Sequence, residues 1–243
     1  MPLPTNYEKY LEHIEALGAE TPLAYGLHPN AEIGFRTTQC NTLFQTLLDI
    51  APKDTGSAGG EGVRTTQDIL QEMVKRFMED INIRSLIFSV DDIKGKLDAD
   101  QKGPYQNVFI QEIEYMTILL TEITRSIEEI YQGIKGLLTI SEKMEQTMDA
   151  LVLNRVPASW TNLAYPSKRG LEGWIINLLQ RIEQLNMFRD DPLTPPKVIM
   201  ISKFFNPQSY LTAIKQVVAA NAKGGYELNK LYIQTDITKK SVE

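Results

Sequence analysis

The chain has 243 residues, of which 42% are apolar and 23% charged, a composition that suits a globular protein of one large domain or two small ones. Its net charge of −6 and pI of about 5.2 disfavour a nucleic-acid partner, because no basic stripe is present to neutralise phosphates. The sequence shows neither a secretory signal nor an apolar run long enough to span a membrane, and its single cysteine, Cys40, excludes a disulfide framework and favours a reducing compartment.

The first fifty residues predict two helices joined by a connector. The first helix covers about 5–17, with Gly18 as its C-cap. The connector at 18–30 contains two prolines and two glycines. A second helix begins near Asn30 and stops before Pro52, because the residue before a proline avoids the helical region.

A flexible segment and an amphipathic helix come next. Residues 52–64 are rich in glycine and poor in apolar side chains, which predicts flexibility. The helix over 65–81 is capped by Thr65 or Thr66, and 82–103 reads as irregular chain or short helices. One face of the amphipathic helix is apolar, made of Ile69, Leu70, Met73, Val74, Phe77 and Ile81.

The strongest periodicity lies between 104 and 154. Apolar residues recur there in steps of four and three, the heptad pattern of coiled coils and helix hairpins. Gly133 and Gly136 weaken the helix, so the segment is either one very long helix or two helices broken near 136–141. The seam consists of Phe109, Ile113, Met116, Leu120, Ile123, Ile127, Ile130, Ile134 and Leu137, and continues through Ser141, Met144, Met148 and Leu151.

This seam has two interpretations. It is either the face of a helix that packs inside a bundle, or a face that pairs with another polypeptide as a free coiled coil. A two-stranded coil does not need further apolar residues beside its seam, so their presence favours the bundle. These additional residues are Ile110, Ile118, Leu119, Tyr131 and Leu138.

The C-terminal part predicts helices and two strands. A turn segment at 154–170 precedes an amphipathic helix over 171–188. Residues 197–202 and 226–240 read as strands from their apolar and β-branched content. The helix between them has Asn206 as N-cap, Pro207 in its first turn and Gly224 and Gly225 as its stop.

The predicted fold class is therefore mainly α: helical layers with one very long helix, plus a small incomplete β portion at the C-terminal end. A sheet of two strands is marginal by itself, and the last strand has nothing beyond it to pair with. We therefore expect the chain to be a piece of a larger protein.

No residue pattern indicates an active site. The glycine-rich run at 56–64 lacks the lysine and hydroxyl of a phosphate-binding loop, and His13 and His28 have no companions for a zinc site. We expect His28 to form a local hydrogen bond near a helix start and Cys40 to be a core thiol. The long helix carries carboxylates that we expect on its solvated or ion-paired side, namely Glu112, Glu114, Glu122, Glu128 and Glu129. We predict no catalytic, cofactor-binding or metal-binding residue.

What the sequence offers instead is surface for packing and interaction. Trp160, Trp174, Phe204 and Phe205 lie at or near turns, where they are either core residues or interface anchors. For Phe204 and Phe205 both interpretations stay open. The predicted interaction and packing residues are Phe109, Ile113, Met116, Leu120, Ile123, Ile127, Trp174, Phe204, Phe205, Asn206 and Pro207.

Five segments, in order, resemble the C-terminal region of dynein heavy chains, and above all the axonemal outer-arm beta class. The resemblance extends over nearly the whole chain. The segments are YGLHPNAEIGF (25–35), PYQNVFIQEIEYM (104–116), VPASWTNLAYPS (156–167), FFNPQSYLTAI (204–214) and DITKK (236–240).

The resemblance implies three parts. Residues 1–18 would end the small helical subdomain of the sixth AAA module, 19–196 would be the helical part of the dynein C-terminal region, and 197–243 would be the strand–helix–strand start of a truncated β-barrel. Family members usually continue with strands that complete this barrel, so an open edge or disorder is expected near 228–243.

The resemblance also implies a role. The chain would be a noncatalytic segment that packs on the AAA ring and supports or modulates ATP-driven, minus-end-directed microtubule motility in the axoneme of cilia or flagella. ATP and magnesium would belong to the parent motor ATPase, and this segment would hold no cofactor. Its partners would be the ring modules of the same heavy chain, with intermediate chains, light chains, other heavy chains and microtubules reached through the parent, and neither nucleic acid nor a membrane.

Two other classes of function remain open at this level. One is a freestanding helical adaptor that pairs through the heptad seam over 109–151. The other is an enzyme of unknown type, for which the residues supply no constellation.

Overall fold

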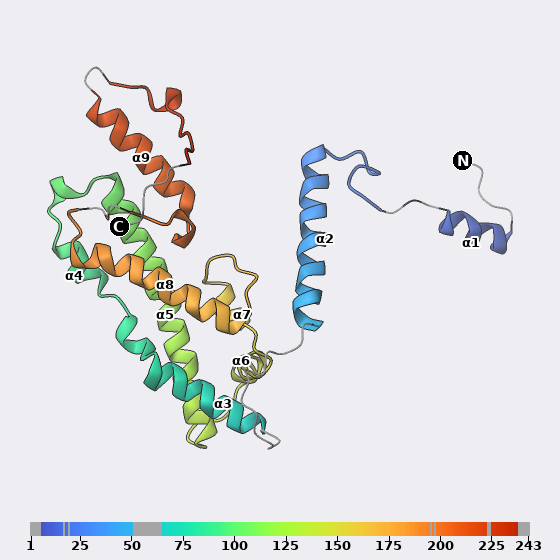
Figure 1. Cartoon of the computed structure of the whole chain (residues 1–243). Coiled ribbons are helices and arrows are strands. Elements are labelled where there is room, and N and C mark those ends of the chain that lie inside the picture. Colours follow the sequence, from blue (N-terminus) through green and yellow to red (C-terminus); the bar gives the residue numbers. More distant parts are fainter. Residues whose placement is uncertain are drawn as a thin grey trace. The chain divides into compact units, whose positions relative to one another are not determined.

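The computed structural model describes residues 6–16, 18, 20–50, 65–194, 196, 198–222 and 225–237 (Figure 1). The chain divides into two compact units, Met1–Asp54 and Thr55–Glu243. The segment 52–64, which the sequence predicts to be flexible, lies outside the described residues.

The first unit contains the two predicted helices, α1 (Tyr7–Glu15) and α2 (Pro29–Ile50). The side chain of Asn6 caps α1 at its start, and Ala16 is its C-cap rather than Gly18. The His28 ring nitrogen Nδ1 accepts the Asn30 N–H at 3.2 Å beside the start of α2, which confirms the local hydrogen bond expected there.

The second unit begins with α3 (Thr66–Lys75), capped by Thr65 in a capping box with Asp68. The expected helix continues as a π-helical turn, η1 (Arg76–Asp80), closed by a bond from the Ile81 N–H to the Arg76 carbonyl at 2.9 Å. Short helices then fill the predicted irregular region: η2 (Ile83–Leu86), α4 (Val90–Gly95) and η3 (Ala99–Gln101).

The heptad region forms two helices, α5 (Pro104–Ile134) and α6 (Glu142–Val152), broken where the sequence allowed it. Gly136 adopts a left-handed φ of +71°, which glycine tolerates best. The Leu137 N–H bonds to the Gln132 carbonyl and the Gly136 N–H to the Gly133 carbonyl, the two bonds of a Schellman motif. Ser141 then caps α6 through the Met144 N–H.

The 31 residues of α5 form the spine of the second unit. It contacts α3, α4, α6, α7 (Ala158–Thr161), α8 (Leu171–Asp190) and α9 (Pro207–Asn221), and Figure 1 shows α8 lying across it. The short helix α7 occurs within the segment that the sequence assigned to a turn.

The predicted seam faces the interior of this unit. From Phe109 to Ile130 its side chains are at most 1% exposed and belong to one hydrophobic core with residues of α3, α6, α7 and α8. The pattern is interrupted at Leu137, which is 74% exposed in the turn after α5, and it resumes in α6, where Met144 and Leu151 are 5% and 1% exposed. The heptad seam is therefore the inner face of a bundle, and its core residues are not available for pairing with another polypeptide.

The helical fold class is confirmed, but the two predicted strands are wrong where the structure describes them. Residues 198–222 and 225–237 contain no strand. Ile201–Lys203 form a single 3-10 turn, η4, and Leu228–Lys230 form another, η5. Apolar, β-branched sequence favours extended backbone, but a strand also needs a second backbone to bond with. Before α9 that partner is a set of side chains, described below.

Candidate functional site

The backbone between Met200 and Asn206 is held by three side chains rather than by a neighbouring strand. The Gln184 side-chain amide pairs with Met200 in both directions: its oxygen accepts the Met200 N–H at 2.9 Å, and its Nε2 donates to the Met200 carbonyl at 3.4 Å. Arg181, one turn earlier on α8, donates from Nη2 to the Ser202 carbonyl at 2.8 Å and from Nη1 to the Phe204 carbonyl at 3.1 Å. These two side chains therefore bond to Met200, Ser202 and Phe204, which are alternate residues in and around the 3-10 turn η4.

The third side chain is Glu112 of α5. Its carboxylate accepts the Phe205 N–H at 2.6 Å and the Asn206 N–H at 2.9 Å. We call Glu112, Arg181 and Gln184 the clasp. The Asn206 side chain in turn accepts the Ser209 N–H and Pro207 opens α9, as the sequence predicted, so the clasp sets where α9 begins.

All three clasp side chains are buried: Glu112 is 2% exposed, Arg181 6% and Gln184 4%. Burial raises the pKa of Glu112, and the two backbone N–H groups and Arg181 oppose this shift. Burial likewise lowers the pKa of Arg181, while Tyr165 and Glu112 oppose that shift. A buried opposite charge and full hydrogen bonding are what keep such groups tolerable in an apolar core.

The position of Glu112 corrects the sequence interpretation, which placed it on the solvated side of the long helix. It lies among seam residues, three positions after Phe109 and one before Ile113, so it faces inward. Periodicity alone marks this position as internal. Periodicity does not reveal why a carboxylate is tolerated at this position. It is tolerated because it accepts two backbone N–H groups, which lie 93 and 94 residues away in the sequence.

Aromatic rings surround the clasp in two sets. The first set joins α5, α8 and α9: Phe109 stacks on Phe188 with centroids 4.6 Å apart, and Phe204 packs edge-on against Phe109 at 5.4 Å and beside Tyr210 at 5.0 Å. Phe204 is 2% exposed. It is therefore a core residue of this protein. The choice between core residue and interface anchor, which the sequence left open, is thus settled for Phe204.

The second set runs through Phe205 along the bundle. Phe205 lies between Tyr115 and Tyr165, at centroid distances of 5.9 and 5.6 Å. The series continues from Tyr165 to Trp174, Trp160 and Phe77 at 6.1, 6.0 and 5.5 Å. The Arg181 guanidinium lies 3.4 Å from the centroid of the Tyr165 ring, a cation–π contact that joins the clasp to this set. Phe205 itself is partly buried against the core.

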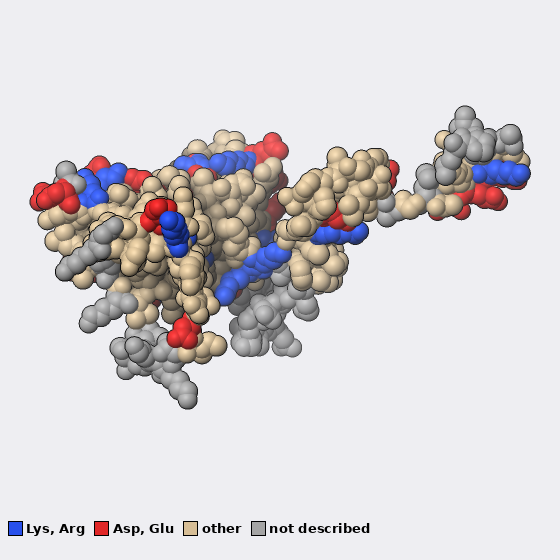
Figure 2. All heavy atoms as spheres, turned by 90° about the horizontal axis from the view of Figure 1, so that it is seen from above, with Lys and Arg blue, Asp and Glu red and all other residues tan. Residues whose placement is uncertain are grey.

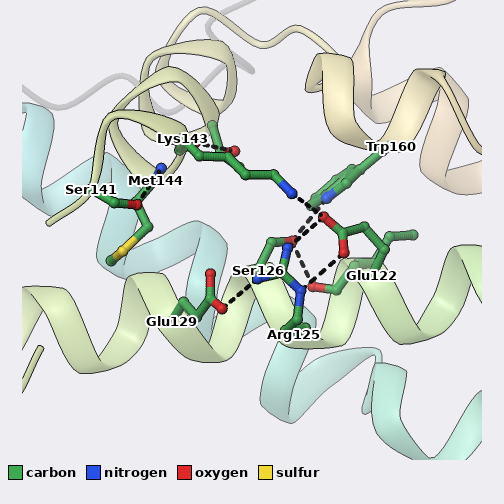
Figure 3. A network of polar contacts seen from close by, with 10 residues as sticks. Glu122, Arg125, Ser126, Glu129, Ser141, Lys143, Met144 and Trp160 are labelled. Carbon is green, nitrogen blue, oxygen red and sulfur yellow. Dashed lines mark hydrogen bonds and ion pairs between the residues drawn. The ribbon is translucent and has the colours of Figure 1, made fainter.

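A second polar network ties α5 to α6 and α7 (Figure 3). Arg125 donates to both oxygens of Glu122, at 2.6 and 3.0 Å, and also to Glu129. Lys143 of α6 reaches the same Glu122 carboxylate at 3.2 Å. The hydrogen bond from Arg125 lowers the pKa of Glu122, and Lys143 adds to this effect.

Beneath this network, the Trp160 indole Nε1 donates to the Ser126 hydroxyl at 2.9 Å (Figure 3). Trp160 is fully buried, and the hydroxyl of Ser126 satisfies its one donor. Glu122 and Glu129 thus occupy the ion-paired face that the sequence predicted for them. Glu114 and Glu128 do so too, through Lys94 and Arg84.

The predicted packing residues separate into three groups by position. Phe109 and Phe204, with Asn206 and Pro207 beside them, meet at the clasp. Trp174 lies in the second aromatic set, at 1% exposure. The remaining seam residues fill the core along α5: Ile113, Met116, Leu120, Ile123 and Ile127. Whether any of them acts in an interaction with another protein stays a prediction.

The sequence analysis missed Arg181, Gln184, Tyr165 and Tyr210. The first two lie on an amphipathic helix, at positions whose spacing of three matches its buried face, and that spacing was the available signal. Tyr165 and Tyr210 gave no signal of their own, because their contacts with Phe205 and Phe109 join segments that are distant in the sequence.

Cys40 is exposed on α2, not a core thiol as expected. None of the described side chains of α2 is buried, so this helix offers no core to receive it. Within the described ranges, no three His, Cys, Asp or Glu side chains gather as a metal site, and no helix is long and apolar enough to cross a membrane. On the face drawn in Figure 2, basic and acidic side chains are interspersed.

Comparison with known proteins identifies the family. The sequence profile that describes the C-terminal domain of dynein heavy chains matches residues 37–243. The chain is 42% identical over 248 residues to "Dynein beta chain, ciliary" of Heliocidaris crassispina, an alignment that covers 100% of this chain and 5% of the relative. It is 40% identical over 248 residues to "Dynein axonemal heavy chain 9" of Homo sapiens, with the same shares.

A third relative is "Dynein beta chain, flagellar outer arm" of Chlamydomonas reinhardtii, 40% identical over 242 residues, which cover 98% of this chain and 5% of the relative. The chain thus spans about 5% of the length of the relatives it matches. Their ciliary, axonemal and flagellar names confirm the axonemal class and location that the resemblance implied. The family profile begins within α2, and the predicted boundary between 18 and 19 stays a prediction. This chain belongs to the family formed by the C-terminal domains of dynein heavy chains, and its named relatives are axonemal heavy chains.

Proposed function

We propose that this chain is the noncatalytic C-terminal segment of an axonemal dynein heavy chain, that it packs on the AAA ring, and that it supports or modulates ATP-driven, minus-end-directed microtubule motility. The observation that carries the proposal is the alignment: the whole chain matches about 5% of each of several long heavy chains. We therefore expect this short segment to act within the whole heavy chain and not as an independent protein.

The architecture of the second unit suits a mechanical part. At 1.5 Å per residue, α5 is about 46 Å long, and one element of that length can contact neighbours far apart from each other. The clasp and the two aromatic sets join α5 to the helices that cross it. Such a body resists bending, because displacement of one helix disturbs buried rings and hydrogen bonds in the others.

We assign ATP and magnesium to other parts of the parent motor and no cofactor to this segment. Its direct partners would be the ring modules of the same heavy chain. Intermediate chains, light chains, other heavy chains and microtubules would be reached through the parent complex. The adaptor alternative is not favoured, because the seam residues from Phe109 to Ile130 already form the core of this protein itself.

The first test is nucleotide binding by the isolated chain, with light scattering on the same sample. We expect no ATP binding, no hydrolysis and a monomer. Tight nucleotide binding would contradict a noncatalytic segment. A stable dimer would shift support to the adaptor.

The second test uses the parent motor with this segment deleted, or with the clasp broken by Glu112→Ala. We expect microtubule gliding velocity or force to change in both variants, whereas Glu114→Ala, which removes a half-exposed carboxylate on the same helix, leaves them unaltered. Unchanged ATPase rate, velocity and force after deletion of the segment would overturn the proposal.

A further inference from the structure

A groove of about 510 Å³ lies between α3, with its π-helical turn, and the C-terminal end of α5. Val74 and Met78 line it from one side, at helical spacing, and Tyr131 and Ile134 from the other. The site is far along α5 from the clasp, and nothing in the proposed function makes use of it.

We propose that this groove docks an amphipathic helix of another polypeptide, with apolar residues on one face and acidic residues on its flanks. The inference goes beyond the proposed function, since it requires neither the AAA ring nor motor activity. Three observations support it: the shape of the groove, the exposed apolar side chains that follow it in the sequence, and the charge of its rim.

The shape favours a helix as the occupant. Both walls of the groove are helices, and their own backbone groups are already bonded within those helices, so the groove offers no strand edge to an extended peptide. A helix satisfies its own backbone and needs only side-chain contacts. The wall at Met78 belongs to the π-helical turn Arg76–Asp80, a distortion that occurs frequently at functional sites.

Further apolar side chains are exposed in the turn between α5 and α6, which follows the groove residues of α5 in the sequence. Tyr131 is 37% exposed, and beyond it Leu137, Leu138 and Ile140 are 74%, 41% and 49% exposed. Ile140 lies close to Gly133, where an added Cβ atom would come within 3.5 Å of its Cγ1. These exposed apolar side chains lie directly after the groove residues in the sequence, and such a concentration of apolar surface is typical of protein contacts.

The rim supplies the charge complementarity. Lys75 and Lys135 line the groove, and neither forms an ion pair with a described carboxylate; Lys135 is placed over the Tyr131 ring instead, with its Nζ 4.1 Å from the ring centroid. Among the described residues that line the groove, Glu79 is the single acidic one. The rim is thus net positive in a protein whose net charge is −6. This charge favours an acidic partner and disfavours a symmetric contact in which the grooves of two copies face each other.

The test uses the full chain and a panel of fluorescein-labelled synthetic helices. Each helix has leucines at i, i+3, i+4 and i+7 and glutamates on both flanks, and the members differ in the register of the leucines. A matched panel has lysines in place of the glutamates. Fluorescence anisotropy gives the Kd of each. We expect at least one acidic helix to bind, its lysine counterpart to bind more weakly, and the affinity to fall as salt is added.

The double variant Lys75→Glu/Lys135→Glu should weaken binding of the acidic helix by about tenfold, because two attractions become repulsions. Its control is Lys102→Glu/Lys230→Glu, which reverses two exposed lysines of the second unit that do not line the groove and should leave the Kd unchanged. Met78→Glu, which puts a charge into the groove itself, should abolish binding. Circular dichroism melting of each variant checks that the fold is retained.

Three outcomes would overturn the proposal. No acidic helix binds; or acidic and basic helices bind equally well to wild type and to the groove variants; or the protein is a dimer by light scattering that Met78→Glu makes monomeric, in which case a second copy is the occupant.

Discussion

At the scale of single residues, the buried carboxylate of Glu112 is the feature that most constrains this fold. It accepts two backbone N–H groups from a segment more than ninety residues away and lies near the buried cation Arg181. A glutamine at this position has one acceptor oxygen, and its NH₂ group would face the second N–H as a competing donor.

We therefore expect Glu112→Gln to lower the free energy of unfolding by about 1–3 kcal/mol, the cost of a buried donor left without a partner. Urea unfolding monitored by circular dichroism measures it. The matched control is Glu114→Gln, which removes a half-exposed partner of Lys94 and should change stability by less than about 0.5 kcal/mol. Equal effects of the two substitutions would show that the clasp contributes nothing beyond a surface ion pair.

The Tyr165 ring gives a prediction for alkaline pH. Burial raises the pKa of its hydroxyl from the ordinary 10.0 to about 12. Between these values the unfolded state loses this proton while the folded state keeps it, so stability falls as pH rises from 10 to about 12.

Over that range we expect wild type to lose about 2–3 kcal/mol more than Tyr165→Phe, which has no proton to lose there. Urea unfolding of both proteins across the range gives the difference, and the other tyrosines cancel in it. Parallel stability curves for the two proteins would contradict a raised pKa at this residue.

At the scale of elements, the two glycines between α5 and α6 have different tasks. Gly136 adopts a left-handed conformation that closes α5, with φ of +71° and no atom within 4 Å of an added Cβ. Gly133 is inside α5, where an added Cβ would come within 2.9 Å of the flexible Cε of Met144. The cost of a side chain is therefore conformational at one position and steric at the other.

Gly136→Ala should lower stability by roughly 1–2 kcal/mol, the cost of a left-handed residue with a Cβ. For Gly133→Ala we expect the free energy of unfolding to change by less than about 1 kcal/mol in either direction, because alanine improves helix propensity and the end of the Met144 side chain can move aside. Thermal unfolding of the two single variants compares them directly. If Gly133→Ala lowers stability more than Gly136→Ala, the close packing of α6 on α5 constrains this junction more than the conformation of the turn does.

The longer helices were predictable because each of them carries its own local signal, whereas the four-residue helix α7 lies in a segment assigned to a turn. Apolar spacing marked α3, α5, α6 and α8, and Asn206 with Pro207 marked the start of α9. The segment 197–202 shows the limit of such signals. Its composition is that of a strand, but whether it becomes one depends on what bonds to its backbone. Here side chains of α8 take that place at Met200 and Ser202, and no local rule contains them.

At the scale of the whole molecule, the second unit has two differently built ends. At one end α9 is attached through the clasp and the first aromatic set, and Ala213 is its single buried residue. At the other, α3, α6 and α7 meet α5 through Phe77, Trp160 and the Glu122–Arg125–Lys143 network. Few buried side chains mean a low free energy of local opening, so α9 should open before the rest.

Hydrogen exchange of variants at the two ends tests this division. Phe204→Ala leaves a cavity that should lower the free energy of unfolding by about 3–5 kcal/mol. The contact that it loosens first is the one between residue 204 and Tyr210 of α9. We expect amide exchange in α9 to accelerate strongly while α3 and α6 keep most of their protection. Trp160→Phe, which loses the hydrogen bond to Ser126, should give the reverse pattern.

If exchange changes at only one end in each variant, the two ends unfold independently. A partner could then bind at one end without disturbing the packing of the other. Equal acceleration at both ends in both variants would instead mean that the bundle opens as one cooperative body, and that a load applied at α9 is carried along α5 to the groove beside α3.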